Sequence, residues 1–128
     1  MPLTPEALDR LTAALAEART TAPVRHRKMF GGLGVYLGEA FVGVVDDDRL
    51  YLKVDALTEP GYVARGMGPW TLDGQPKPYR EVPPDALDDP AALGALLEEA
   101  GEATERLKAA AQGSKGSKRR TKGAPSTT

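Results

Sequence analysis

Residues 25–54 read RHRKMFGGLGVYLGEAFVGVVDDDRLYLKV, the most densely β-patterned part of the chain. From Met29 its periodicity changes towards two, and Leu50, Leu52 and Val54 alternate with Tyr51 and Lys53, as in antiparallel strands that place one face on a core and leave the other face wetter. Three consecutive strands are predicted, one around Val35 and Leu37, one over the apolar run 41–45, which three aspartates end, and one over residues 50–54. Short turns between them make the stretch a β-meander.

Three glycines, Gly31, Gly32 and Gly34, follow the basic start of this stretch. Glycines let backbone amides approach a phosphate closely. A P-loop, however, needs a lysine and a hydroxyl just after its last glycine, and a dinucleotide fingerprint needs a helix there, whereas here a strand follows. The glycines are therefore predicted to serve the backbone, as a sharp bend or β-bulge at positive φ.

A helix is predicted on each side of the β region. The segment 4–20 begins with Thr-Pro, the pattern of a hydroxyl N-cap with proline at the first helical position, and continues with apolar residues at helical spacing. The segment 89–111 begins with Asp-Pro and carries leucines and alanines three and four residues apart. Both are expected to pack an apolar stripe on the sheet.

Two smaller elements are predicted between these helices. A short helix is expected to begin after Thr58 and to end at Gly66 in the left-handed conformation. Residues 70–72 and 77–82 are expected to form a hairpin around the turn at 73–74. The prolines beside its second strand favour an edge position.

The composition is that of one globular domain. The chain has 128 residues, of which 41% are hydrophobic and 27% charged, which suffices for one compact core. With the predicted elements, this indicates a single α+β domain over residues 1–112, an antiparallel β-sheet flanked by N- and C-terminal helices. No apolar stretch approaches the roughly 20 residues of a membrane span, and the N-terminus lacks the features of a signal peptide. A cytoplasmic protein without membrane contact is expected.

Residues 113–128 have a different composition, GSKGSKRRTKGAPSTT, and are predicted to be a disordered basic tail. The tail holds five cations and no acid, although the whole chain has a net charge of −1. Such an arm can bind an anionic partner, or it can simply keep a terminus soluble. If it binds nucleic acid, the contacts are weak, salt-sensitive and made by Lys115, Lys118, Arg119, Arg120 and Lys122.

The side chains offer little catalytic chemistry. The chain has no cysteine, and its three serines all lie in the tail, which argues against a serine or cysteine hydrolase. The one histidine, His26, stands in a basic run and is interpreted as a surface residue. The acids at 46–48 lack the ligand spacing of an EF-hand and are interpreted as a hydrated turn. No catalytic, metal-binding or cofactor-binding residue is predicted, and the protein is not expected to be an enzyme.

Several ordered pieces of the chain together resemble the N-terminal domain of the TfoX/Sxy family of competence regulators. They are MFGGLGVY at 29–36, the acid-rich turn, RLYLKV at 49–54, GPW at 68–70, YREVP at 79–83 and the final helix. The resemblance covers roughly residues 4–110. It implies a small α+β domain, often dimeric, without established catalytic residues. Members with a second, C-terminal domain switch on DNA-uptake genes alongside the cyclic-AMP receptor protein, and here a basic tail stands where that domain would begin.

The leading functional hypothesis is therefore a non-enzymatic regulatory module that acts through protein contacts, with a transcription factor or the transcription machinery as partner and with homodimers expected from the resemblance. Its predicted interaction surface consists of Arg25, Arg27, Lys28, Met29, Phe30, Gly31, Gly32, Tyr51 and Lys53. The alternative is an accessory nucleic-acid-binding protein that uses the basic tail. A separate nucleic-acid candidate is the basic run, in which Arg25, Arg27 and Lys28, with Arg19 nearby, would contact phosphates while Phe30 and Tyr36 stack on bases.

Overall fold

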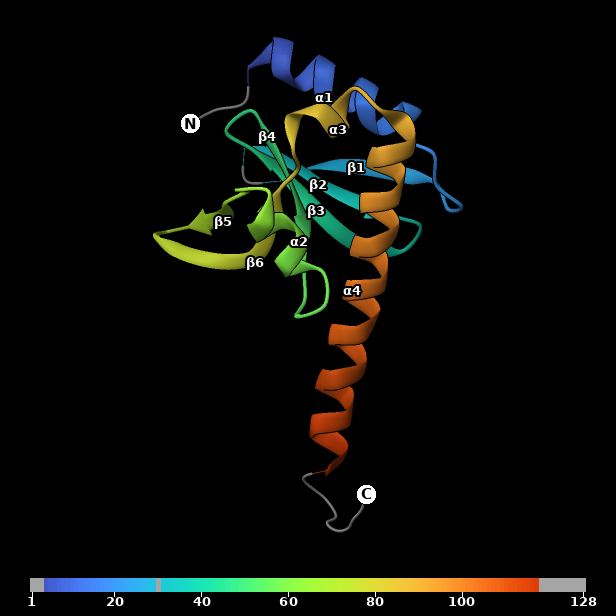
Figure 1. Ribbon diagram of the computed structural model, residues 1–128, viewed down its shortest axis with the longest axis vertical. Coiled ribbons are helices and arrows are strands. Elements are labelled where there is room, and N and C mark those ends of the chain that lie inside the picture. The colour runs from blue at the N-terminus through green and yellow to red at the C-terminus, as the bar shows by residue number, and fades with distance from the viewer. Residues whose placement is uncertain (1–3, 30, 118–128) are drawn as a thin grey trace.

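Six antiparallel strands form one open sheet with the order β1-β2-β3-β4-β6-β5 (Figure 1). The computed structural model describes residues 4–29 and 31–117, with side chains as far as Gln112. The strands are β1 Val24–Met29, β2 Gly32–Leu37, β3 Ala40–Asp46, β4 Arg49–Lys53, β5 Pro69–Leu72 and β6 Gln75–Glu81. With the helices described below, the sheet makes up the α+β domain predicted from the sequence.

The described chain also contains four helices, α1 Pro5–Glu17, α2 Glu59–Ala64, α3 Pro84–Leu87 and α4 Pro90–Ser117. The two long helices begin as predicted. The Thr4 hydroxyl accepts a hydrogen bond from the Ala7 amide at 3.2 Å, and the Asp89 carboxylate accepts from the amides of Ala91 and Ala92 at 3.1 and 3.2 Å. These caps satisfy amides that have no partner within the helix.

The end of α4 differs from the prediction. The sequence indicated that structure stops at Gln112, whereas the helix continues to Ser117. Extending an existing helix requires no new nucleus, so even glycine and serine can prolong it. The rest of the predicted tail, residues 118–128, lies outside the described residues. Figure 1 shows α4 crossing in front of the sheet and continuing well beyond it.

The core lies between the helices and one face of the sheet. Leu11 and Leu15 of α1 and Leu93 and Leu97 of α4 are at most 1% exposed. They pack against sheet side chains that include Leu33, Val35, Leu50 and Leu52. Ala86 of α3 joins the same cluster, and Arg80, which is opposite Leu52 in the ladder, donates to Glu59 of α2. All four described helices therefore cover one face, here called the helix face.

The opposite side of the sheet, here called the open face, is not covered by any of the helices in the described chain. Strand alternation and side-chain contacts place on it Arg25, Arg27, Met29, Tyr36, Phe41, Val44, Tyr51, Lys53, Trp70 and Tyr79.

Strand β1 was not predicted. The basic run was interpreted as the entry to a strand, but Val24–Met29 pair with Leu37–Gly32 along an unbroken register. The four central residues of β1 are exposed and polar, and its apolar residues stand only at the two ends, so the strand has no alternation that would reveal it in a sequence.

The second hairpin is confirmed, but its prolines do not lie on an edge strand. Pro76 and Pro78 belong to β6, which lies between β4 and β5, and β5 forms the edge. Strand β4 pairs only with residues 79–81 of β6. Pro76 lies where β6 extends beyond β4. Pro78 is opposite Val54, the residue after β4, and its carbonyl still accepts from the Val54 amide at 3.0 Å, so the ladder ends where proline has no N–H to return.

The short helix α2 begins and ends near the predicted positions, although Thr58 does not cap it with its side chain. The Thr58 hydroxyl instead donates to Asp55 and accepts from the Asp55 amide. Gly66 adopts a φ of +75°, which confirms the predicted left-handed end of the helix.

None of the helices within the described residues is long and apolar enough to cross a bilayer.

Asp55 links the loop after β4 to α4. Its carboxylate accepts from Arg106 Nε at 2.5 Å and from a terminal guanidinium nitrogen of the same arginine at 3.2 Å. It also accepts from the amides of Leu57 and Thr58. These donors, the Arg106 side chain first among them, lower the pKa of Asp55 to about 2.

We expect Asp55→Asn to destabilise the protein in a pH-dependent way. The folded-state pKa lies below the ordinary aspartate value of about 3.9, so the contribution of the charged carboxylate is complete above that value and is lost as pH falls towards about 2. Urea unfolding at several pH values measures the difference between wild type and variant. It should stay constant from neutral pH to about pH 5 and then shrink. As a control, Asp85→Asn removes a carboxylate that is 83% exposed and should change little at any pH. An unchanged Asp55→Asn difference at low pH would contradict this assignment.

Candidate functional site

An aromatic row runs across the open face from β2 to β5. The rings of Tyr36 and Phe41 have centroids 5.3 Å apart, those of Phe41 and Tyr79 6.3 Å, and those of Tyr79 and Trp70 5.4 Å. Each pair meets edge to face, the arrangement that the ring quadrupoles favour. Tyr79, in the middle of the row, is only 7% exposed. The aromatic row thus forms a small second layer of packing on the side without helices.

The sheet bends so that β5 approaches strands far from it in the sheet order. The Trp70 indole N–H of β5 donates to the Asp46 carboxylate of β3 at 2.9 Å, although β4 and β6 lie between these strands. A cavity of about 30 Å³ is lined by residues that include Met29 of β1 and Trp70 and Leu72 of β5. Both edge strands therefore contribute to one concave surface, and the cavity has room for roughly one water molecule.

Cations border the aromatic row. The Arg25 guanidinium lies 5.8 Å from the centroid of the Tyr36 ring and donates to the carbonyl of Gly38 at 2.9 Å. The Lys53 ammonium lies 4.6 Å from the centroid of the Tyr79 ring and 3.1 Å from its hydroxyl. These cation–π contacts hold both side chains in place.

The open face has an excess of positive charge. Within residues 4–29 and 31–112, no carboxylate lies within 4.0 Å of the charged groups of Arg25, Arg27 or Lys53. The two acids of this face are already engaged, Asp46 by Trp70 and Glu81 by Arg49 at 3.0 Å. An acidic partner would therefore meet cations that are available to it.

Tyr51 adds a hydroxyl group to the open face. It lies opposite Glu81 in the β4–β6 ladder and is half-buried. Burial, followed by the nearby Glu81 carboxylate, raises the pKa of Tyr51 above its ordinary value. The side chain therefore stays a neutral hydrogen-bonding phenol at physiological pH.

The structure brings together part of the surface predicted from the sequence. Arg25, Arg27, Met29, Tyr51 and Lys53 all lie on the open face. Lys28 lies on β1 too, but strand alternation turns it to the helix-face side. Phe30, which belongs to the predicted surface and is also a stacking candidate, lies outside the described residues.

The two glycines of the predicted surface play different parts. Gly31 has a φ of +78°, which confirms the predicted bend. Gly32 is buried in β2 and is not part of an exposed surface. A Cβ atom there would lie 1.9 Å from the carbonyl oxygen of Val45, so Gly32 is needed for close approach of the strands. The prediction of positive φ was wrong for Gly32 and Gly34.

The predicted nucleic-acid contacts of the tail remain predictions. Lys115 lies within the backbone of α4, but its side chain is outside the described set. Lys118, Arg119, Arg120 and Lys122 lie outside the described residues altogether.

The sequence did not predict Phe41, Trp70 and Tyr79 as parts of the surface. They lie far apart in the chain, and only the β4–β6 pairing brings the second hairpin next to the meander.

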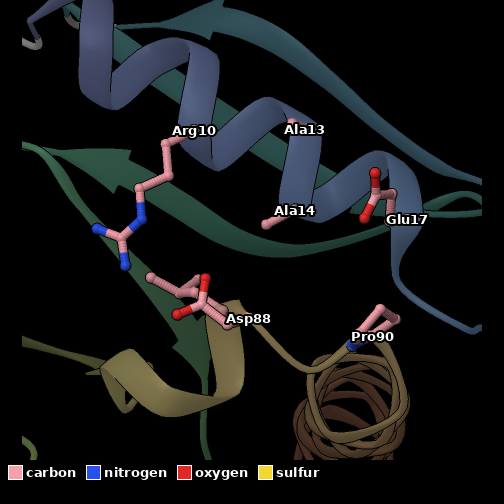
Figure 2. A pocket seen from close by; sticks show the side chains of 7 residues that line it. Arg10, Ala13, Ala14, Glu17, Asp88 and Pro90 are labelled. Carbon is pink, nitrogen blue, oxygen red and sulfur yellow. The ribbon is translucent and has the colours of Figure 1, made fainter.

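A second hollow lies on the helix side, between α1 and the start of α4 (Figure 2). Its volume is about 280 Å³. Arg10 and Glu17 lie at opposite ends of the α1 wall with Ala13 and Ala14 between them, and Asp88 lies on the facing wall. The lining has no hydroxyl, thiol or imidazole group. No group of three acids or histidines in the described parts of the chain is placed to hold a metal ion.

The family model of the TfoX N-terminal domain matches residues 15–104. The chain belongs to the TfoX N-terminal domain family. The match runs from the end of α1 into α4 and includes every strand, so it confirms the resemblance drawn from the sequence. A search of curated proteins found no match. In this TfoX N-terminal domain, the open face and β1 thus lie wholly within the part that defines the family.

Proposed function

We propose that this TfoX N-terminal domain is a non-enzymatic regulatory module that binds an acidic surface of a partner protein through its open face and β1. The observation that carries the proposal is the available positive charge of Arg25, Arg27 and Lys53 around an aromatic row on a face without helices. Aromatic and arginine side chains are the groups that most often anchor protein interfaces. A transcription factor or the transcription machinery is the partner class that fits the family, and regulation of DNA-uptake genes would act through such a contact.

The ring geometry favours a protein over single-stranded nucleic acid as the partner. Nonspecific single-strand binders present flat ring faces on which bases stack. Here the rings are turned edge to face against one another, and cations lie over those of Tyr36 and Tyr79. Few ring faces are left for bases, whereas a protein surface can use ring edges, hydroxyls and charges together.

We expect the partner contact to depend on Arg27 and Lys53. The double variant Arg27→Gln/Lys53→Gln removes two charges that have no ion pair in the described chain, so the fold should survive. Losing two interfacial charges should weaken binding by about tenfold or more. The matched control is Lys108→Gln, an exposed cation on α4 away from the sheet.

The experiment is affinity capture from native lysate with each variant, with and without nuclease, followed by identification of the bound proteins and binding measurements with the purified partner. The proposal requires an acidic protein that wild type and Lys108→Gln retain in both arms and that the double variant loses. Equal retention by the double variant, or loss of the partner on nuclease treatment, would overturn it.

A further inference from the structure

The two edges of the sheet differ in how they are protected. The β5 edge is four residues long, starts with Pro69 and has an irregular register against β6. The β1 edge is six residues long, contains no proline and pairs with β2 without a bulge. Short length, proline and irregularity block the addition of another strand at β5, and none of these protects β1.

The backbone of β1 presents outward hydrogen-bonding groups at alternate residues. The Gly38 amide donates to the Pro23 carbonyl at 2.8 Å, so these two residues form a hydrogen-bonded pair just before β1. Hydrogen-bonded and non-hydrogen-bonded pairs alternate along an antiparallel ladder. Arg25 and Arg27 therefore turn their amides towards β2, whereas Val24, His26 and Lys28 turn theirs to the outer edge, with which no strand of the described residues pairs.

The side chains of β1 select what can pair with that edge. Arg25, His26, Arg27 and Lys28 are consecutive and exposed, so positive charge lies along both faces of the strand. A second copy of β1 would place like charges opposite one another, which destabilises a strand pair, whereas a strand that carries acids is favoured. Arg25 is already held by Tyr36 and the Gly38 carbonyl, so little of its freedom remains to be lost on binding.

We propose that the β1 edge binds an extended acidic segment of the partner protein by strand addition, with acids at alternate positions facing Arg25 and Arg27. The main-chain bonds go to Val24, His26 and Lys28, and the acids next to the open face give the charge selectivity. The inference rests on the proposed function for the nature of the partner as a protein, and it adds the site and the chemistry of the segment that binds there.

The test compares His26→Pro with His26→Ala. Both remove the imidazole, but only proline removes the outward N–H of residue 26, and it leaves the amides that bond to β2 intact. The probe is an acetylated and amidated peptide in which four glutamates alternate with three valines. The same peptide with glutamine in place of glutamate serves as the charge control. Circular dichroism confirms that each variant is folded.

Binding of the peptide should slow amide exchange at His26 and Lys28 of the wild type by about tenfold or more while leaving Arg25 and Arg27 unchanged. His26→Ala should bind the acidic peptide like wild type, and His26→Pro and Arg27→Glu should bind it at least about tenfold more weakly. The glutamine peptide should bind more weakly as well. Equal binding by His26→Pro and His26→Ala, or no alternation in amide protection at millimolar peptide, would falsify strand addition.

The outcomes separate this inference from the proposed function. If lysate capture still depends on Arg27 and Lys53 but His26→Pro captures the partner like His26→Ala, the open face binds a protein and the edge mechanism is wrong. If a short oligothymidylate displaces the peptide and binds His26→Pro equally well, the β1 charges act as a nonspecific anion site and the inference fails. A shift of the free protein to a dimer that His26→Pro abolishes would assign the edge to a second copy instead.

Discussion

Replacing Gly94 with alanine is expected to lower the free energy of unfolding by about 2–3 kcal/mol, although alanine is the better helix former by about 1 kcal/mol. Gly94 lies in α4 where the segment after α1 crosses the helix. A Cβ atom there would lie 2.0 Å from the carbonyl oxygen of Arg19 and 2.7 Å from its carbonyl carbon. Both are backbone atoms, so the two segments have to separate, and overpacking of this kind costs about 1–3 kcal/mol or more.

That segment has little freedom to move away from α4. The Arg19 amide donates to the Pro90 carbonyl at 3.0 Å, and the Thr21 amide and hydroxyl donate to the Glu98 carboxylate at 2.6 and 3.0 Å. A shift large enough to admit the methyl group would stretch these bonds on both sides of Gly94. Their loss is why we place the expected effect at the upper end of the overpacking range.

The matched control is Gly101→Ala, about two helical turns further along α4. The nearest atom to a Cβ there is a methyl carbon of Leu37 at 3.2 Å, the end of a side chain that can rotate away. The helix-propensity gain of up to about 1 kcal/mol should therefore be largely kept. Thermal melts and urea titrations of the two variants should differ in sign. Similar stabilities would mean that the contact between Arg19 and α4 does not constrain the helix.

The sequence alone predicted those elements in which the spacing of apolar side chains reveals a buried face. The meander from β2 to β4 has apolar residues at strand spacing or in a short run bounded by turns, and both long helices have apolar stripes and proline starts, so the fold class and most element positions were predicted correctly. Strand β1 was missed because its four central side chains are exposed and, among the described residues, it pairs with β2 alone, so its charges give no periodic signal. The sequence of residues 75–81 likewise did not show that β6 lies inside the sheet. Its position depends on the pairing with β4, which is distant in the chain and meets only residues 79–81.

The candidate site was predicted only in part, for a related reason. Arg25, Arg27 and Lys53 could be named because charge is visible in a sequence. The aromatic row could not, because Tyr36, Phe41, Trp70 and Tyr79 become neighbours only through the strand order and the bend of the sheet. A pattern in one segment does not encode which distant segment will lie beside it.

Gly32→Ala is expected to cost about 3 kcal/mol and to lower the Tm by about 10 °C. A Cβ atom at Gly32 would lie 1.9 Å from the Val45 carbonyl oxygen and 3.1 Å from its carbonyl carbon, within the backbone of β3. The neighbouring pair Leu33–Val45 begins the β2–β3 ladder. Strand β3 would have to move away from β2 where both strands contact α4. The packing of the core would therefore loosen together with the ladder.

The adjacent Gly31 provides the contrast, because it is required for its backbone φ and not for space. A Cβ atom there meets nothing within 4 Å, but the φ of +78° is unfavourable for alanine by about 1–2 kcal/mol. Asparagine tolerates this conformation, so Gly31→Asn should recover most of the stability that Gly31→Ala loses, whereas Gly32→Asn should be no better than Gly32→Ala. Thermal unfolding of the four variants therefore separates a glycine needed for its φ from one needed for space. If asparagine rescues position 32 as well, the close approach of β2 to Val45 is not what requires glycine there. If asparagine fails to rescue position 31, the positive φ is not what requires glycine at that position.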